Sequence, residues 1–327
     1  MAKNSSHPAE GPCSPDDQLP PLRVLVSWSP SSTGTEAIEF AAWLARSTSV
    51  RIRVVSTISQ PLTVTSLSKL SGSYKKWFKK ERATCERAVK QALNEAGVDK
   101  EQLDKNVSVL LAGPSRPQLL EQAAKDFKAS VILLGANQSA PKGRFFSGST
   151  ADALLHYSPL PVGLIPRGIK LSKHGVTRIN FAFTDLGNAD DPALLHAACI
   201  AQRGGIALRI LAFSAKGLVD VPLEYSPTFP PDAPNWREHS LSLLDRAHDL
   251  IAETYPEVSV TTAIGSGHGW SGAVDSLKWK KGDLLCLGSA PMGPIERVFI
   301  GSTATELLPH LGVPVLVCPS TYDKEAR

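Results

Sequence analysis

The chain has 327 residues, of which 42% are apolar and 20% are charged, and this length suffices for two hydrophobic cores of ordinary size. Lys and Arg number 35 against 31 Asp and Glu, so the formal net charge of +4 is too small to indicate nucleic acid as a partner. The five cysteines form no C-x-x-C pair, which argues against a zinc site or a disulfide framework and favours a reducing compartment.

Residues 1–20 are polar and are predicted to form a disordered leader. They lack the apolar core of a signal peptide, and no apolar run approaches the ~18 residues of a membrane-spanning helix. We therefore expect a cytoplasmic protein that has neither a membrane nor a nucleic acid as its partner.

Strands and helices alternate along residues 21–167, the first predicted domain. Apolar runs predict strands at 23–28, 51–57, 107–112, 131–134 and 161–165, and periodic segments predict helices at about 35–46, 74–96, 116–127 and 150–157. In the helix at 74–96 the apolar residues recur with a 3.6-residue period, and Gly97 follows as a C-cap. Trp28, Trp43 and Trp77 fall on apolar faces and are interpreted as core residues.

Residues 177–320 repeat this order as a second predicted domain, after a linker at 168–176 and before a tail at 321–327. Gly288 and Gly301 stand 153 residues after Gly135 and Gly148, so the duplication preserves the spacing of these glycines. Asp191 before Pro192 predicts a helix N-cap. The stretches 59–73 and 217–236 interrupt the repeat and are predicted to be surface loops.

The alternation predicts an α/β fold in which helices cover both faces of a parallel sheet. We expect the two domains to pair side by side within the chain. The terminal strands end at Pro166 and Pro319 and are predicted as candidate sheet edges, through which the protein could also form a homodimer.

The segments after the two fourth strands have the features of an anion site. Ligands of open parallel sheets lie beyond the carboxyl ends of the strands. Gly148-Ser149-Thr150 and Gly301-Ser302-Thr303 immediately precede predicted helices, whose first N–H groups suit phosphate. Ordinary helix capping is the alternative, because Ser149 with Asp152 and Thr303 with Glu306 fit the S/T-x-x-[DE] capping box.

These loops resemble the universal stress protein pattern G-2x-G-9x-G-[ST]. The first copy has Gly135, Gln138, Gly148 and Ser149 at the four positions, and the second copy has Gly288, Pro291, Gly301 and Ser302. Three of the four positions match in each copy, and the likeness extends over about residues 22–320. The chain is therefore similar to the tandem two-domain members of that family.

The resemblance implies two flavodoxin-like, or adenine nucleotide α-hydrolase-like, domains, each with a five-stranded parallel sheet of order 3-2-1-4-5. It also implies ATP as the ligand of some members, which Mg²⁺ could accompany. By this analogy the triphosphate lies at Gly135, Gln138, Gly148, Ser149 and Thr150, with Ser29 and Thr57 near the base or ribose. The corresponding residues of the second copy are Gly288, Gly301, Ser302 and Thr303.

Four residues depart from the family pattern. Gln138 and Pro291 replace its second glycine, and because proline has no N–H, the second copy is predicted to be the poorer nucleotide site. Ser29 and Thr184 replace the family's acidic residue at the end of the first strand, and a hydroxyl forms a weaker hydrogen bond than a carboxylate. The loop residues Lys142, Arg144 and Arg297 either neutralise phosphate or are ordinary solvated charges.

We interpret the chain as a stress-linked regulatory protein that binds an adenine nucleotide and acts on an unknown protein partner. No nucleophile arrangement or metal-ligand spacing occurs, so we do not expect an enzyme. A nucleotide-free interaction scaffold is the alternative.

Two further motifs are interpreted as structural. Gly267–Gly272 fits G-x-G-x-x-G but follows a third strand, so it is interpreted as a turn. The basic helix at 74–96 is interpreted as a solvated face, with an acidic partner or RNA as the alternative.

Overall fold

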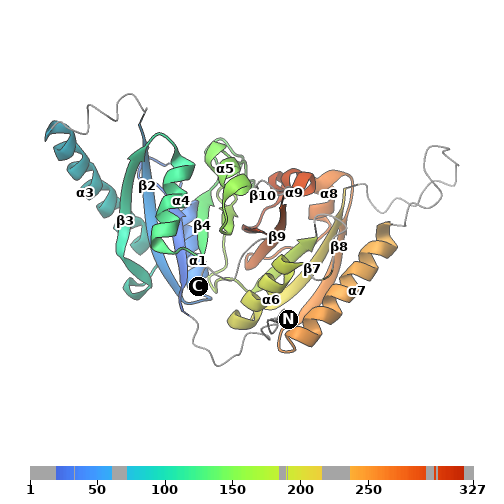
Figure 1. Cartoon of the computed structure of the whole chain (residues 1–327). Coiled ribbons are helices and arrows are strands. Elements are labelled where there is room, and N and C mark those ends of the chain that lie inside the picture. Colours follow the sequence, from blue (N-terminus) through green and yellow to red (C-terminus); the bar gives the residue numbers. More distant parts are fainter. Residues whose placement is uncertain are drawn as a thin grey trace, which may run out of the picture.

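The computed structural model describes residues 20–32, 34–60, 72–183, 189, 191–215, 236–291, 298–299 and 301–319. The described strands form an eleven-stranded sheet with helices on both faces, as Figure 1 shows. The predicted tail, Thr184, Arg297 and most of the leader lie outside the described residues, as do residues 61–71 of the first predicted loop and residues 217–235 of the second. The α/β class expected from the alternating pattern is confirmed.

The first half of the chain follows the predicted order, and its boundaries fall within a few residues of those expected. Its elements are β1 (Leu22–Ser27), α1 (Glu36–Ala45), β2 (Val50–Ser59), α3 (Gly72–Glu95), η1 (Lys100–Gln102), β3 (Leu103–Gly113), α4 (Arg116–Phe127), β4 (Val131–Gly135), α5 (Ser149–Tyr157) and β5 (Val162–Ile165).

The second half repeats the order of strands and α-helices and adds a short strand after the fourth, while its 3-10 helix precedes the last strand instead of the third. Its elements are β6 (Arg178–Phe183), α6 (Pro192–Gly204), β7 (Ala207–Ser214), α7 (Trp236–Thr254), β8 (Val260–Ser266), α8 (Gly269–Asp275), β9 (Asp283–Pro291), β10 (Val298–Phe299), α9 (Gly301–Leu307), η2 (Leu308–His310) and β11 (Val315–Pro319). The added strand β10 folds back antiparallel on β9, pairing Val298 with Pro291.

Each half has the strand order 3-2-1-4-5: β3-β2-β1-β4-β5 in the first half and β8-β7-β6-β9-β11 in the second. The prediction that β5 and β11 are edges is wrong. They pair with each other, antiparallel, through Val162–Val317, Gly163–Leu316 and Leu164–Val315. The two parallel sheets therefore form one sheet whose outer strands are β3 and β8.

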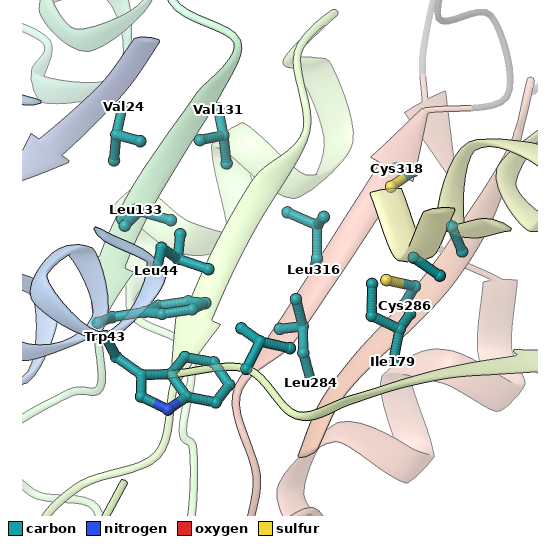
Figure 2. Packing of buried hydrophobic residues seen from close by; sticks show 14 of the residues in the cluster. Val24, Trp43, Leu44, Val131, Leu133, Ile179, Leu284, Cys286, Leu316 and Cys318 are labelled. Atoms are coloured by element: carbon teal, nitrogen blue, oxygen red, sulfur yellow. The ribbon is translucent and has the colours of Figure 1, made fainter. Parts of the chain in front are cut away.

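The core continues across this junction on both faces of the sheet. Buried residues of α1, α3, α6 and α7 share one cluster, and those of α4, α5, α8 and α9 share the other. Figure 2 shows Leu133 of β4, Leu316 of β11 and Leu284 of β9 in one layer with Trp43 of α1.

The thiol of Cys318 in β11 is part of this core. Burial, together with the nearby Asp191 carboxylate, raises the pKa of Cys318 to about 12, so this thiol stays protonated.

The three tryptophans expected in the core have three different environments. Trp43 is fully buried, as predicted, and Trp28 is half-buried and donates its indole N–H to the carbonyl of Gly34 at 2.9 Å. The prediction for Trp77 is wrong because its side chain is 44% exposed. The buried residues of α3 begin only at Cys85, so the periodic pattern extends farther along the helix than its packing does.

The glycines at 267–272 span the turn from the outer strand β8 into α8, of which Gly269 and Gly272 form part of the first turn. A Cβ on Gly267 would clash with the backbone of Gly272, so close approach of the two backbone segments accounts for the glycines. Asp191 caps α6 by accepting a hydrogen bond from the N–H of Ala193 at 2.8 Å, and Gly97 has φ +77° after α3. Both caps are confirmed.

Gly163 lies at the middle of the β5–β11 junction, and a Cβ there would overlap Leu133 and lie 3.0 Å from Phe40. We predict that Gly163→Val lowers the free energy of unfolding by about 1–3 kcal/mol, because it overpacks a filled core. Urea denaturation of the whole chain measures this change. Gly72→Ala, at a site where a Cβ meets nothing within 4 Å, is the matched control and should change stability by less than about 0.5 kcal/mol.

Candidate functional site

A cavity of about 570 Å³ lies at the carboxyl ends of β1, β2 and β4. Its wall contains all seven residues predicted for the first copy, namely Ser29, Thr57, Gly135, Gln138, Gly148, Ser149 and Thr150. The wall also includes the first residues of α1 and α4 and the segment that follows β5. The site is therefore assembled from loops that are far apart in the sequence but follow adjacent strands.

The N-terminus of α5 opens into this cavity. Gly148 is its N-cap residue, with φ −104° and ψ 171°, and no side chain caps the helix. Ser149 is the first helical residue rather than the cap, so the alternative of a Ser149–Asp152 capping box is not formed. The first N–H groups of α5 thus have the geometry in which helix termini bind anions.

The fold itself does not require glycine at the two motif positions in the wall. A Cβ on Gly135 would lie 3.7 Å from the nitrogen of Ala37, and one on Gly148 would lie 3.7 Å from the side chain of Asn137. Both distances are ordinary contacts, and neither glycine has a positive φ. Gln138, at the second motif position, has no positive φ either, so no backbone strain accompanies its replacement of glycine.

Cations predominate in the wall. Lys142, Arg116 and Arg167 line the cavity, while of its described lining residues Glu36 alone carries a carboxylate. Glu36 accepts a hydrogen bond from the N–H of Gly168 at 3.3 Å, and Arg167 donates to the carbonyl of Ala140 at 2.9 Å. The cavity is therefore held in a framework of hydrogen bonds and has a net positive lining that suits an anion.

Sequence reasoning identified Lys142 but missed Arg116 and Arg167. Both follow the carboxyl ends of strands, β3 and β5 respectively, and this position is the signal that could have identified them. Arg144, the other predicted cation, has a different role because it donates to the carbonyl of His310 in the second half at 2.5 Å. It is a contact between the two halves rather than a part of the cavity wall.

Thr57 of β2 is the most deeply buried polar side chain among the predicted residues. It is only 9% exposed, it lines the cavity, and within the described part of the chain its hydroxyl has no hydrogen-bond partner. Its oxygen is not sealed from solvent and faces the cavity. A ligand or a water molecule in the cavity would satisfy it. The hydroxyl of Ser29 lies nearer the surface and 3.0 Å from that of Ser31.

The second half is built differently at the corresponding place. The carboxylate of Asp191 lies 3.2 Å from where a Cβ of Gly288 would stand, and it already caps α6. The strand β9 continues to Pro291 and pairs with β10, whereas β4 ends at Gly135. Gly301, Ser302 and Thr303 form the first turn of α9, and Glu306 accepts a hydrogen bond from Trp270 at 2.7 Å. The Asp191 carboxylate therefore stands beside Gly288, where the first half has the backbone and methyl group of Ala37 beside Gly135.

Comparison with known proteins identifies the family. Residues 22–166 and residues 176–319 each match the universal stress protein family. Universal stress proteins of Mycobacterium tuberculosis (strain H37Rv) and Mycobacterium bovis are 26% identical to the chain over 305 residues, covering 91% of it and all of the relative. The chain belongs to the universal stress protein family and carries two tandem copies of its domain.

Solved structures agree on the fold. A universal stress protein from Archaeoglobus fulgidus has a TM-score of 0.63 at 19% identity, covering 91% of this chain and 98% of that one. A functionally unknown protein from Pseudomonas aeruginosa PAO1 has a TM-score of 0.52 at 15% identity, covering 91% of this chain and 92% of that one.

None of the helices within the described residues combines the length and the hydropathy that a membrane-spanning segment needs.

The two first-helix caps give a test of the difference between the halves. Thr35, the N-cap of α1, makes no side-chain cap and instead donates to Glu39 on the surface, whereas Asp191 caps α6. We predict that Asp191→Ala lowers the free energy of unfolding by about 1 kcal/mol and that Thr35→Ala lowers it by less than half as much. Urea titrations of the two variants compare them directly, and equal losses would contradict the assignment.

Proposed function

We propose that the first half of the protein binds a nucleoside triphosphate, with ATP as the nucleotide that the family resemblance implies, and that the protein acts as a nucleotide-dependent regulator in a stress response. The observation that carries the proposal is the uncapped α5 N-terminus facing a cavity with a net positive lining. An anion there would gain N–H hydrogen bonds and a favourable helix dipole.

The phosphate chain would lie against Gly135, Gly148 and the N–H groups of Ser149 and Thr150. The space at the two glycines supports this placement, because a phosphate oxygen would occupy the volume that a side chain takes elsewhere. Lys142 and Arg167, in the same wall, would neutralise the phosphate charge. Gln138 lines this end and adds an amide donor.

The ribose and base would lie toward Ser29 and Thr57, which end β1 and β2 on the other side of the cavity. The hydroxyl of Thr57 would gain its missing hydrogen-bond partner from the nucleotide. No group of three His, Cys, Asp or Glu side chains occurs among the described residues. A magnesium ion accompanying ATP would therefore be held by phosphate oxygens and water together with at most Glu36.

A nucleotide-free scaffold is the second candidate, and the second half favours it. There the Asp191 carboxylate stands against Gly288 and would repel phosphate. We therefore propose one nucleotide per chain, with the second half serving as a structural partner. The curated relatives are named universal stress proteins, and we propose a regulatory rather than a catalytic role.

Gly148→Leu tests the phosphate site. The new side chain would extend into the cavity, so we predict that affinity for MgATP falls at least ~100-fold in isothermal titration calorimetry. The matched control is Gly301→Leu in the second copy, which should leave the stoichiometry at about one nucleotide per chain. A flat titration of the wild type with millimolar MgATP, and no nucleotide released on denaturing the purified protein, would favour the scaffold.

Thr57→Val separates a ligand contact from a structural one. The valine has the same shape and removes a hydroxyl that has no described protein partner, so thermal stability should stay the same or rise slightly. Nucleotide affinity should fall by about 3–10-fold, which corresponds to one net hydrogen bond. A loss of stability with unchanged affinity would show that the hydroxyl serves the fold instead.

A further inference from the structure

The net charge of the protein is concentrated in one half-helix. Residues 72–84 of α3 carry five cations, Lys75, Lys76, Lys79, Lys80 and Arg82, and one carboxylate, Glu81. Their sum of +4 equals the formal net charge of the entire chain, so the remaining residues balance to zero. Within the described residues none of the five cations has an ion-pair partner, whereas Lys90 farther along α3 pairs with Glu86 at 2.7 Å.

This half-helix contributes no buried residue to the core of the protein. The buried residues of α3 are Cys85, Val89, Ala92 and Leu93, all in its second half, and no residue between 72 and 84 is buried. A segment of this length spans about 20 Å. Figure 1 places α3 at one end of the molecule, beside the outer strand β3, so a large flat surface can reach it.

Three aromatic rings accompany the cations. Tyr74, Trp77 and Phe78 stand at positions i, i+3 and i+4, with ring centroids 5.5–6.3 Å apart, and the Trp77 side chain is 44% exposed. The Tyr74 hydroxyl accepts a hydrogen bond from Gln60 at 2.6 Å, which ties the cluster to the end of β2. The rings occupy the side of the helix on which Cys85 and Val89 are buried farther along, and Glu81 lies on this side as well. Lysines flank the rings on both sides.

We propose that residues 72–84 of α3 form a docking surface for an anionic membrane. Aromatic rings at the level of the lipid headgroups, with lysines reaching the lipid phosphates, are typical of helices that lie in the membrane interface. Four of the five cations are lysine, which protein–protein interfaces disfavour and anionic lipid surfaces attract. A nucleic acid would need a broader basic face, yet the charge outside this segment is balanced.

This surface is separate from the cavity and does not depend on nucleotide binding. The expectation of no membrane partner rested on the lack of a spanning segment, and surface contact needs none. Binding of this kind is weak and reversible, falls with added salt, and requires negatively charged lipid.

Cosedimentation of the full-length protein with vesicles provides the test. The wild type should bind vesicles of 30% phosphatidylglycerol in phosphatidylcholine at 50 mM salt and should not bind pure phosphatidylcholine. A variant with Lys75→Gln, Lys76→Gln, Lys79→Gln and Lys80→Gln should lose about 1,000-fold in partitioning, from the ~1 kcal/mol that each of the four lysines contributes at an anionic surface. Trp77→Ser should lose about 10-fold, because it removes the exposed ring.

The matched control removes four other exposed lysines of equal charge, by Lys100→Gln, Lys105→Gln, Lys125→Gln and Lys173→Gln. It should bind within about threefold of the wild type. The proposal is wrong if the wild type does not bind anionic vesicles, if the two four-lysine variants bind alike, or if the wild type binds a 20-nucleotide RNA and no vesicles. Circular dichroism of each variant verifies that α3 and the fold are retained.

Discussion

Three residue pairs between β5 and β11 determine how the rest of the molecule is arranged. Each half alone would end in a strand with unpaired N–H and C=O groups on one side, and such edges invite association with other chains. Antiparallel pairing of the two terminal strands satisfies both edges at once and turns two parallel sheets into one. The small size of Gly163 leaves room for Leu133 and Phe40 beneath this junction, so the two hydrophobic cores continue across it.

The duplicated sequence produces two unlike sites, and the difference arises at the first helix of each half. Gly135 lies against the backbone nitrogen of Ala37, whereas Gly288 lies against the carboxylate of Asp191. That carboxylate stabilises α6 by capping it, and the same negative charge disfavours an anionic ligand at this place. The second half thus places a capping carboxylate beside Gly288, whereas the N-cap residue of α1 in the first half makes no side-chain cap and leaves no carboxylate against Gly135.

Much of this architecture could be predicted from the sequence because it depends on local patterns. Hydrophobic periodicity located the elements, and the family resemblance supplied the strand order, which the structure confirms. The glycine pattern of the first copy indicated residues that line the cavity. The β5–β11 pairing, Arg116 and Arg167 were missed because each depends on contacts between segments that are distant in the sequence. Trp77 was misjudged because a periodic pattern shows which face of a helix is apolar but not where its packing partner ends.

The cavity and the junction between the halves also share a segment, the loop from β4 to α5. Its residue Lys142 lines the cavity, while Gly143 and Arg144 exchange backbone hydrogen bonds with Arg167, just beyond β5. Arg144 then continues to the His310 carbonyl in the second half. A ligand that orders this loop would therefore act on a segment that also contacts the other domain. Coupling between a ligand site and a domain interface requires that the ligand favours one arrangement of the interface over another. In this protein three consecutive residues, 142–144, provide both the contact with the cavity and the contact with the second half.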